Sequence, residues 1–119
     1  NVSKMRGKVI LVDFWATWCG PCVAEIPNVV ASYKKLHEKG FEIVGISFDQ
    51  DKDKLATMTK EKEMPWSQYF DGEGWGNKFG KQFGITSIPR MWLINKKGMV
   101  VDTNGRDDLE KKVEKLLAE

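Results

Sequence analysis

Apolar runs and segments with helical periodicity follow one another in a regular order along this chain. Residues 8–15 (KVILVDFW) and 41–48 (FEIVGISF) are dense in β-branched and aromatic side chains, which is typical of buried strands. Between these runs, apolar residues recur at helical spacing from Ile26 to Leu36, and Gly40 is suited to end the predicted helix. The first part of the chain therefore predicts a strand, a helix and a second strand.

The rest of the chain predicts shorter elements, in this order: helix 51–63, short strand 66–70, loop 72–76, helix 77–83, strand 91–94, strand 99–102 and helix 107–118. A hairpin-type loop joins the last two strands. This order favours an α/β domain whose early strands are parallel and whose late pair is antiparallel. Since no repeat or linker divides the chain, a single domain over residues 1–119 is expected.

Composition and charge exclude several classes of protein. The chain has 19 basic and 17 acidic residues, a net charge of +2, and no basic block, so no nucleic-acid partner is expected. Its apolar runs fall far short of the ~20 residues that a membrane-spanning helix needs, so no membrane contact by this domain is expected. The chain begins at Asn1 without an initiator Met or a leader, which predicts a processed or excised piece.

The two cysteines carry the most specific chemistry in the sequence. They stand as Cys19-Gly20-Pro21-Cys22, directly after the first predicted strand and at the start of the first predicted helix. Free N–H groups and partial positive charge at a helix N-terminus favour a thiolate over a thiol. The pattern predicts a redox pair in which Cys19, the more exposed, attacks a disulfide and Cys22 resolves the mixed disulfide.

Two other interpretations of the cysteine pair stay open at this point. The pair could be half of a zinc site, or it could be a buried and inert pair. A zinc site needs about four ligands, and His37 is the one further ligand source of this kind. Redox chemistry is the favoured interpretation, and it requires no metal and no bound cofactor, because the dithiol itself carries the two electrons.

Two carboxylates near the cysteines are candidates for moving protons. Asp13 interrupts an otherwise apolar strand, and a carboxyl so placed should have a raised pKa and exchange protons near neutral pH. The alternative is that Asp13 faces solvent at the end of its strand. Glu25 lies one helical turn beyond Cys22, close enough to act on either sulfur, and its alternative is a solvated residue on the helix surface.

The five tryptophans are divided by their distance from the cysteines along the chain. Trp15 and Trp18 flank the redox motif and could form an apolar rim on which a partner docks. The other three, Trp66, Trp75 and Trp92, are interpreted as packing in the core or in loops. This division rests on sequence position and on no periodic pattern.

Residues 12–22 (VDFWATWCGPC) resemble the active-site segment of the thioredoxin superfamily almost letter for letter. Residues 22–27 (CVAEIP) look like the extracytoplasmic TlpA/ResA-like branch of that superfamily. The separation from Cys19 to Pro89, longer than in thioredoxin itself, and residues 84–89 (GITSIP) resemble the same branch. The similarity covers nearly the whole chain.

This resemblance implies an α/β thioredoxin-like fold, with a central mixed sheet flanked by helices and a TlpA-type insert between the second strand and a cis-proline. It implies that this proline is Pro89, that it faces the cysteines, and that Ile88 offers backbone hydrogen bonds to an extended peptide. The implied substrate-binding residues are Trp18, Gly20, Pro21, Ile88 and Pro89. The sequence departs from the branch at two places: Asp13 stands where Asn is frequent, and Arg90 where Thr is common.

The function that the resemblance implies is reduction of protein disulfides outside the cytoplasm, for example in cytochrome c maturation or in general disulfide reduction. The cytoplasm is the alternative location. The implied partners of the monomer are proteins with disulfides and an electron-donating thiol–disulfide protein, with a membrane-embedded donor as one option. Two rival functions are a thiol peroxidase of the peroxiredoxin class, which would need its cysteine in a Thr-containing loop, and a non-catalytic metal or haem chaperone.

Overall fold

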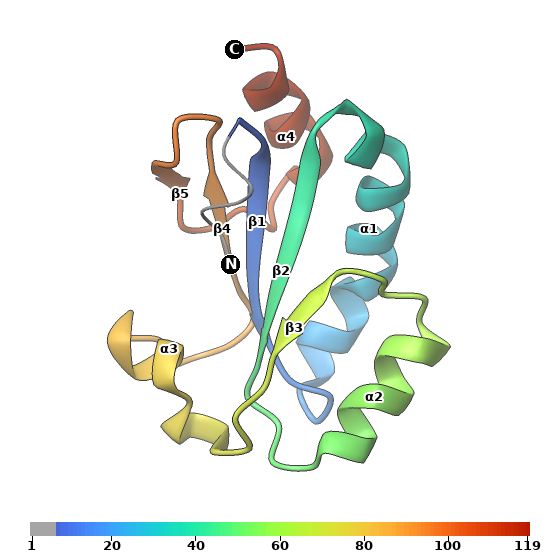
Figure 1. Cartoon of the computed structure of the whole chain (residues 1–119), viewed down its shortest axis with the longest axis vertical. Helices are drawn as coiled ribbons and strands as arrows, with labels where there is room; N and C mark the ends of the chain where they lie inside the picture. The colour runs from blue at the N-terminus through green and yellow to red at the C-terminus, as the bar shows by residue number, and fades with distance from the viewer. Residues whose placement is uncertain (1–6) are drawn as a thin grey trace.

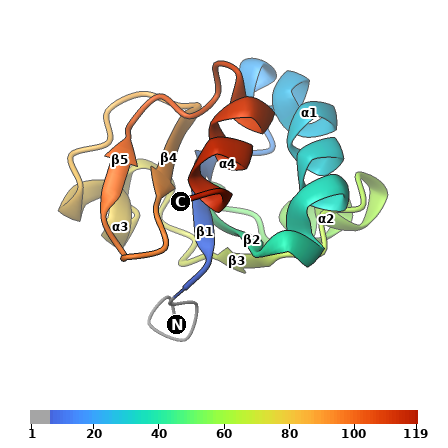
Figure 2. The same cartoon turned by 90° about the horizontal axis from the view of Figure 1, so that it is seen from above.

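Five strands form one mixed sheet with helices on both faces (Figures 1 and 2). The computed structural model describes residues 7–119, so the start of the chain at Asn1 lies outside the described residues. The elements are β1 Val9–Trp15, α1 Gly20–Leu36, η2 His37–Lys39, β2 Phe41–Ser47, α2 Lys52–Glu61, β3 Ser67–Tyr69, η3 Gly74–Gly76, α3 Lys78–Gln82, β4 Arg90–Ile94, β5 Val100–Asp102 and α4 Leu109–Leu117.

The predicted elements are present, and the thioredoxin-like fold class is confirmed. One difference lies in the predicted loop at 72–76, where the structure has the short 3-10 helix η3. Its turn is closed by backbone hydrogen bonds from Gly76 N–H to the Glu73 carbonyl and from Asn77 N–H to the Gly74 carbonyl. A glycine-rich segment carries no hydrophobic period, so a pattern search could not distinguish this turn from an open loop.

The topology brings three distant parts of the chain to one end of the sheet. The strand order is β3-β2-β1-β4-β5, with β1, β2 and β3 mutually parallel and β4 antiparallel to both β1 and β5. The end of β1 therefore lies beside the end of β2, where Trp15 pairs with Ser47, and beside the start of β4, where Phe14 pairs with Arg90. Cys19 follows β1 and Pro89 precedes β4, so both lie at this end of the sheet.

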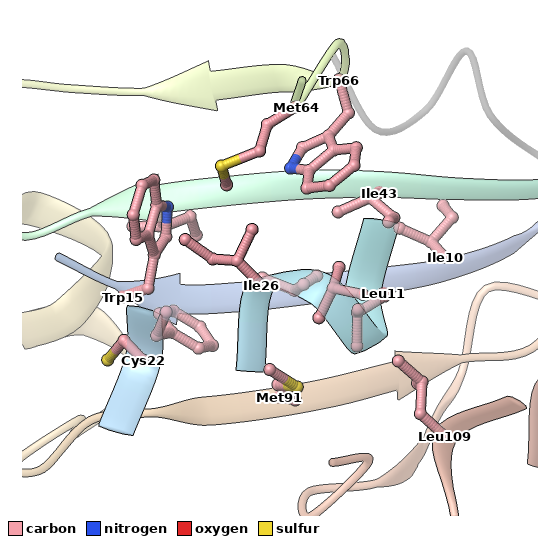
Figure 3. Packing of buried hydrophobic residues seen from close by; sticks show 14 of the residues in the cluster. Ile10, Leu11, Trp15, Cys22, Ile26, Ile43, Met64, Trp66, Met91 and Leu109 are labelled. Atoms are coloured by element: carbon pink, nitrogen blue, oxygen red, sulfur yellow. The ribbon is translucent and has the colours of Figure 1, made fainter. Parts of the chain in front are cut away.

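The central strand β1 is buried on both faces, as its continuous apolar run predicts. On one face, Leu11 and Trp15 lie in a cluster with Ile26 and Cys22 of α1 (Figure 3). Asp13 lies between them in sequence, and alternation along a strand places it on the same face. Helices α1 and α4 cover this face, and α3 lies on the other (Figure 2).

The segment between β2 and β4 is fastened to the sheet by a buried asparagine. Asn77 is fully buried, and its side-chain amide donates to the Ser47 carbonyl at 3.0 Å. Its Oδ1 accepts the backbone N–H groups of Phe79 and Gly80, which caps α3. Gly80 is needed here, because a Cβ atom would stand 2.6 Å from the ring of Phe48. The segment is thus held at the edge that carries Cys19.

Candidate functional site

Cys19 and Cys22 form a disulfide at the start of α1. Cys19 is the N-cap residue of this helix, and the backbone N–H of Cys22 donates to its sulfur at 3.2 Å. Pro21 stands in the first turn, where its missing N–H costs nothing, and Gly20 and Pro21 are both exposed. The sulfur of Cys19 therefore lies where helix N–H groups and the helix dipole stabilise a thiolate once the disulfide is reduced.

The difference in exposure between the two cysteines is small. Cys19 is 6% exposed and Cys22 is 3% exposed, so the order predicted from the sequence holds, but both are buried in the disulfide form. Cys22 contributes from α1 to the buried hydrophobic cluster (Figure 3). A partner disulfide can therefore approach only along the narrow exposed surface of Cys19.

The segment before β4 lies against the disulfide. The Ile88–Pro89 peptide bond is cis, as the resemblance implies. The Ile88 carbonyl oxygen stands 3.9 Å from the Cys19 sulfur, although 69 positions separate the two residues. Ile88 and Pro89 are both half-buried, so they border the cysteine without covering it.

Asp13 is a buried carboxyl, which rules out the alternative that it faces solvent. It is 4% exposed, and within the described part of the chain its Oδ1 has no hydrogen-bond partner. Burial and, secondly, the negative charge of Glu25 raise the pKa of the Asp13 carboxyl to about 7. The group can therefore both accept and release a proton near neutral pH, on the face of β1 that α1 covers.

Glu25 is partly buried and has a cationic neighbour that the sequence did not indicate. Its Oε1 lies 3.9 Å from Nε of Arg106, whose side chain comes from the segment between β5 and α4. The Glu25 side chain is 28% exposed. This exposure is lower than that of a fully solvated residue, the alternative interpretation, but Glu25 is not buried beside the sulfurs either. Glu25 is thus paired with a cation, while its own negative charge contributes to the raised pKa of Asp13.

The predicted rim of Trp15 and Trp18 is wrong for Trp15. Trp15 is 1% exposed, and its indole N–H donates to Gln68 Oε1 at 2.9 Å. Its position in β1 puts it on the same buried face as Leu11, which the alternation of the strand indicates. Trp18 is 53% exposed, as a docking residue should be.

Trp75 packs in its loop against the buried Phe48, as interpreted, but it is also half-exposed. Trp75 is 49% exposed, and its ring centroid lies 5.9 Å from that of Trp18. No sequence pattern connected these two residues, because Trp75 comes from the glycine-rich segment at η3. The interpretation also holds for Trp66, which is buried, and for Trp92, which packs against the core.

A buried carboxylate that the sequence analysis missed supports the loop before Cys19. Asp49, 2% exposed, follows β2 and accepts the Thr17 backbone N–H at 3.0 Å and the Thr17 hydroxyl at 2.5 Å. It also accepts the Ser47 hydroxyl at 2.6 Å. The bonds from Thr17 join the end of β2 to the loop that places Trp18 and Cys19, and the bond from Ser47 orients the Asp49 carboxylate.

Replacing Asp49 with asparagine is expected to lower the free energy of unfolding by about 1–3 kcal/mol, because an amide N–H would face donors that need an acceptor. Urea denaturation of the oxidised protein measures this loss. The matched control is Asp51→Asn two residues on: Asp51 is an exposed N-cap of α2, and asparagine caps a helix as well as aspartate does. Equal losses in both variants would contradict the supporting role of Asp49.

Residues 7–119 lack two features. No group of three or more histidine, cysteine, aspartate or glutamate side chains lies close enough to hold a metal ion there. No helix in that range is long and apolar enough to cross a membrane.

Comparison with known proteins assigns the chain to a family. A family model described as Redoxin matches residues 1–117. The chain belongs to the Redoxin family. Among curated Redoxin relatives, the thiol:disulfide interchange protein HelX of Rhodobacter capsulatus is 31% identical over 94% of this chain and 62% of its own length. The thiol-disulfide oxidoreductase ResA of Bacillus thuringiensis is 29% identical over 98% of this chain and 66% of its own length.

A solved structure agrees with this assignment. The thioredoxin domain of a thiol-disulfide oxidoreductase from Bacteroides vulgatus superposes with a TM-score of 0.87 at 29% identity, covering 98% of this chain and 84% of that one. The resemblance to the TlpA/ResA-like thiol–disulfide oxidoreductases is therefore confirmed. The chain spans a little under two thirds of the length of the two curated relatives, at 62% and 66%.

Proposed function

We propose that this Redoxin chain is a single thioredoxin-like domain that reduces disulfides in proteins, with Cys19 as the nucleophile and Cys22 as the resolving thiol. One observation carries the proposal. The Cys19 sulfur caps the N-terminus of α1 and lies 3.9 Å from the carbonyl of Ile88, the residue before Pro89. In the dithiol form, a stabilised thiolate thus borders the backbone of Ile88, to which the resemblance assigns the binding of an extended peptide.

The reaction follows from the dithiol form. The Cys19 thiolate attacks one sulfur of the substrate disulfide, so that a Cys19–substrate bond forms and the first substrate thiolate leaves. Cys22, once deprotonated, attacks the Cys19 sulfur, releases the second substrate thiolate and forms the Cys19–Cys22 disulfide. The substrate gains the two electrons that the dithiol loses, so no bound cofactor is needed.

Asp13 and Glu25 are assigned to proton transfer. The second step needs a base for the buried Cys22 thiol, and the pKa of the Asp13 carboxyl, raised to about 7, suits proton exchange at neutral pH. Glu25 acts on Asp13 through its charge, which is the second cause of the raised pKa. Both assignments rest on position as well as charge, because Asp13 lies under α1 and Glu25 lies one turn beyond Cys22.

The substrate side of the site comprises residues that stay accessible. Gly20 and Pro21 are exposed beside Cys19, Trp18 is half-exposed, and Ile88 and Pro89 offer backbone on the other side. We propose proteins with disulfides as substrates and a second thiol–disulfide protein as electron donor. The similarity to HelX and ResA supports these partners, and the resemblance to the TlpA/ResA-like branch supports action outside the cytoplasm.

The test is catalysis of insulin disulfide reduction by dithiothreitol, followed as turbidity. We expect turnover with the wild-type chain and none with a Cys19→Ser/Cys22→Ser double variant. Because Gly20-Pro21 is the dipeptide of thioredoxin, the reduction potential should lie near about −270 mV and far from the −120 mV of a strong oxidant. Absence of turnover, or a potential at the oxidising value, would refute a reductase.

A further inference from the structure

Two half-exposed indoles, Trp18 and Trp75, lie together next to the disulfide, and the reaction proposed above does not use Trp75. Trp18 directly precedes Cys19, whereas Trp75 comes from η3. Figure 1 shows the segment before α3 and the start of α1 at the same end of the sheet. Soluble proteins rarely leave large aromatic side chains exposed side by side unless the surface binds something.

Trp75 is held in place by buried groups behind it. Its ring stands nearly perpendicular to that of Phe48, at a centroid distance of 5.3 Å, and Phe48 is fully buried. Gly80 also packs against the Phe48 ring. Asn77 ties the same segment to the end of β2. Trp75 is thus a fixed part of this surface, so a ligand can use it without first ordering it.

A hollow of about 330 Å³ lies beside the two indoles. It is lined by Trp18, Phe48, Gln50, Gly74 and Trp75. No charged side chain is among these residues, and the polar group in the lining, apart from the indole N–H groups, is the Gln50 amide. An apolar or aromatic side chain therefore fits this hollow better than a charged one.

We propose that Trp75 is a specificity-determining residue: the hollow beside Trp18 and Trp75 receives an apolar side chain next to the substrate cysteine that Cys19 attacks. This inference rests on the proposed function. When the sulfur of a substrate cysteine bonds to Cys19, the residues that flank the substrate cysteine lie within about 4–7 Å of it. They are then close to Trp18, the neighbour of Cys19. Tryptophan is enriched among the few residues that carry most of the binding energy at protein interfaces.

The experiment compares two symmetric disulfide dimers of one short peptide, in which the single cysteine is flanked on both sides by phenylalanine or by serine. Each dimer is a substrate for the wild-type chain with dithiothreitol as donor, and kcat/KM is measured for both. We expect the wild type to prefer the phenylalanine dimer. Trp75→Ala should lower kcat/KM for that dimer about tenfold and leave the serine dimer within about twofold, since the lost contact is apolar.

Two further variants keep the result interpretable. Trp75→Phe should retain most of the preference, because it keeps an aromatic ring on Phe48. Met99→Ala is the control: Met99 is 60% exposed, and it lies in the turn between β4 and β5, at the end of the sheet opposite Cys19. It should leave both rates unchanged. The unfolding midpoint of each variant confirms that the compared proteins are folded.

The outcomes separate this inference from the proposed function. Reduction of both dimers at equal rates by the wild type, or an unchanged preference in Trp75→Ala, overturns the role of Trp75 and leaves the reductase in place. Equal loss of the preference in Met99→Ala also overturns it. Reduction of neither dimer, with no turnover of insulin, refutes the reductase and the inference together.

Discussion

The Cys22→Ser variant is expected to lose turnover and to accumulate substrate bound covalently to Cys19. The first step, attack by Cys19, needs no second thiol, but release of the mixed disulfide needs Cys22. We expect steady-state reduction to fall on the order of 10³-fold or more, since the missing group belongs to the covalent machinery. Non-reducing electrophoresis and mass spectrometry of the trapped peptide measure the complex.

The matched control is Cys19→Ser, which should lose turnover equally but trap nothing. The two variants have the same composition, and each leaves one free thiol. A difference in the amount of trapped complex therefore shows which of the two positions in α1 holds the nucleophile. Alkylation at different pH values adds a second measure: in the reduced wild type, Cys19 should react before Cys22 and titrate below an ordinary thiol's value of about 8.5. A covalent complex on Cys22 in the Cys19→Ser variant would reverse the assignment.

The parts of the fold and site that the sequence predicted are those set by short-range physics. The β-branched run of β1, the periodicity of α1 and the Cys19-Gly20-Pro21-Cys22 motif each act within about one element, so one window of sequence contains the cause. The burial of Asp13 followed from its apolar neighbours. The burial of Trp15 could also have been predicted, because alternation along β1 places it with Leu11 and Asp13.

The parts that were missed depend on contacts between distant segments. Trp75 meets Trp18 only because β2 ends beside β1 and Asn77 fastens the following segment to Ser47. Arg106 reaches Glu25 from the segment between β5 and α4, across a sequence separation that no periodicity encodes. Sequence patterns report which face of an element is apolar, but they do not report which elements meet at an edge.

The Asp13→Asn variant is expected to be more stable than the wild type at pH 8, by about 2–4 kcal/mol. The pKa of the Asp13 carboxyl is 3.8 when solvated and about 7 in the folded chain. Between these pH values folding takes up a proton, so the free energy of unfolding falls as pH rises, by about 1.4 kcal/mol per pH unit. Above the folded pKa the penalty is complete, and below pH 3.8 it is absent.

Urea denaturation of the oxidised protein at pH 4, 6 and 8 measures this dependence. The advantage of Asp13→Asn should grow with pH and vanish near pH 4. Glu38→Gln serves as the control, because it removes one carboxylate from an exposed position in η2 and should change stability little at any pH. A difference between Asp13→Asn and wild type that stays constant with pH would show that Asp13 does not titrate in this range.

The same substitution separates the effect of Asp13 on protein stability from its role in the reaction. With no base beneath α1, Asp13→Asn should slow the attack of Cys22 on the mixed disulfide by about 10²-fold at pH 7, the usual contribution of a positioned base. Glu25→Gln keeps that base but removes a negative charge that raises its pKa, so the pH profile of this step should move to lower pH. Stopped-flow measurement of thiolate release from a preformed Cys19 mixed disulfide isolates the step.

If both variants keep the wild-type profile, solvent water alone deprotonates Cys22, and the buried charge of Asp13 only reduces stability. If Glu25→Gln alone changes it, the proton passes through the carboxylate on α1, and Asp13 does not act as the base.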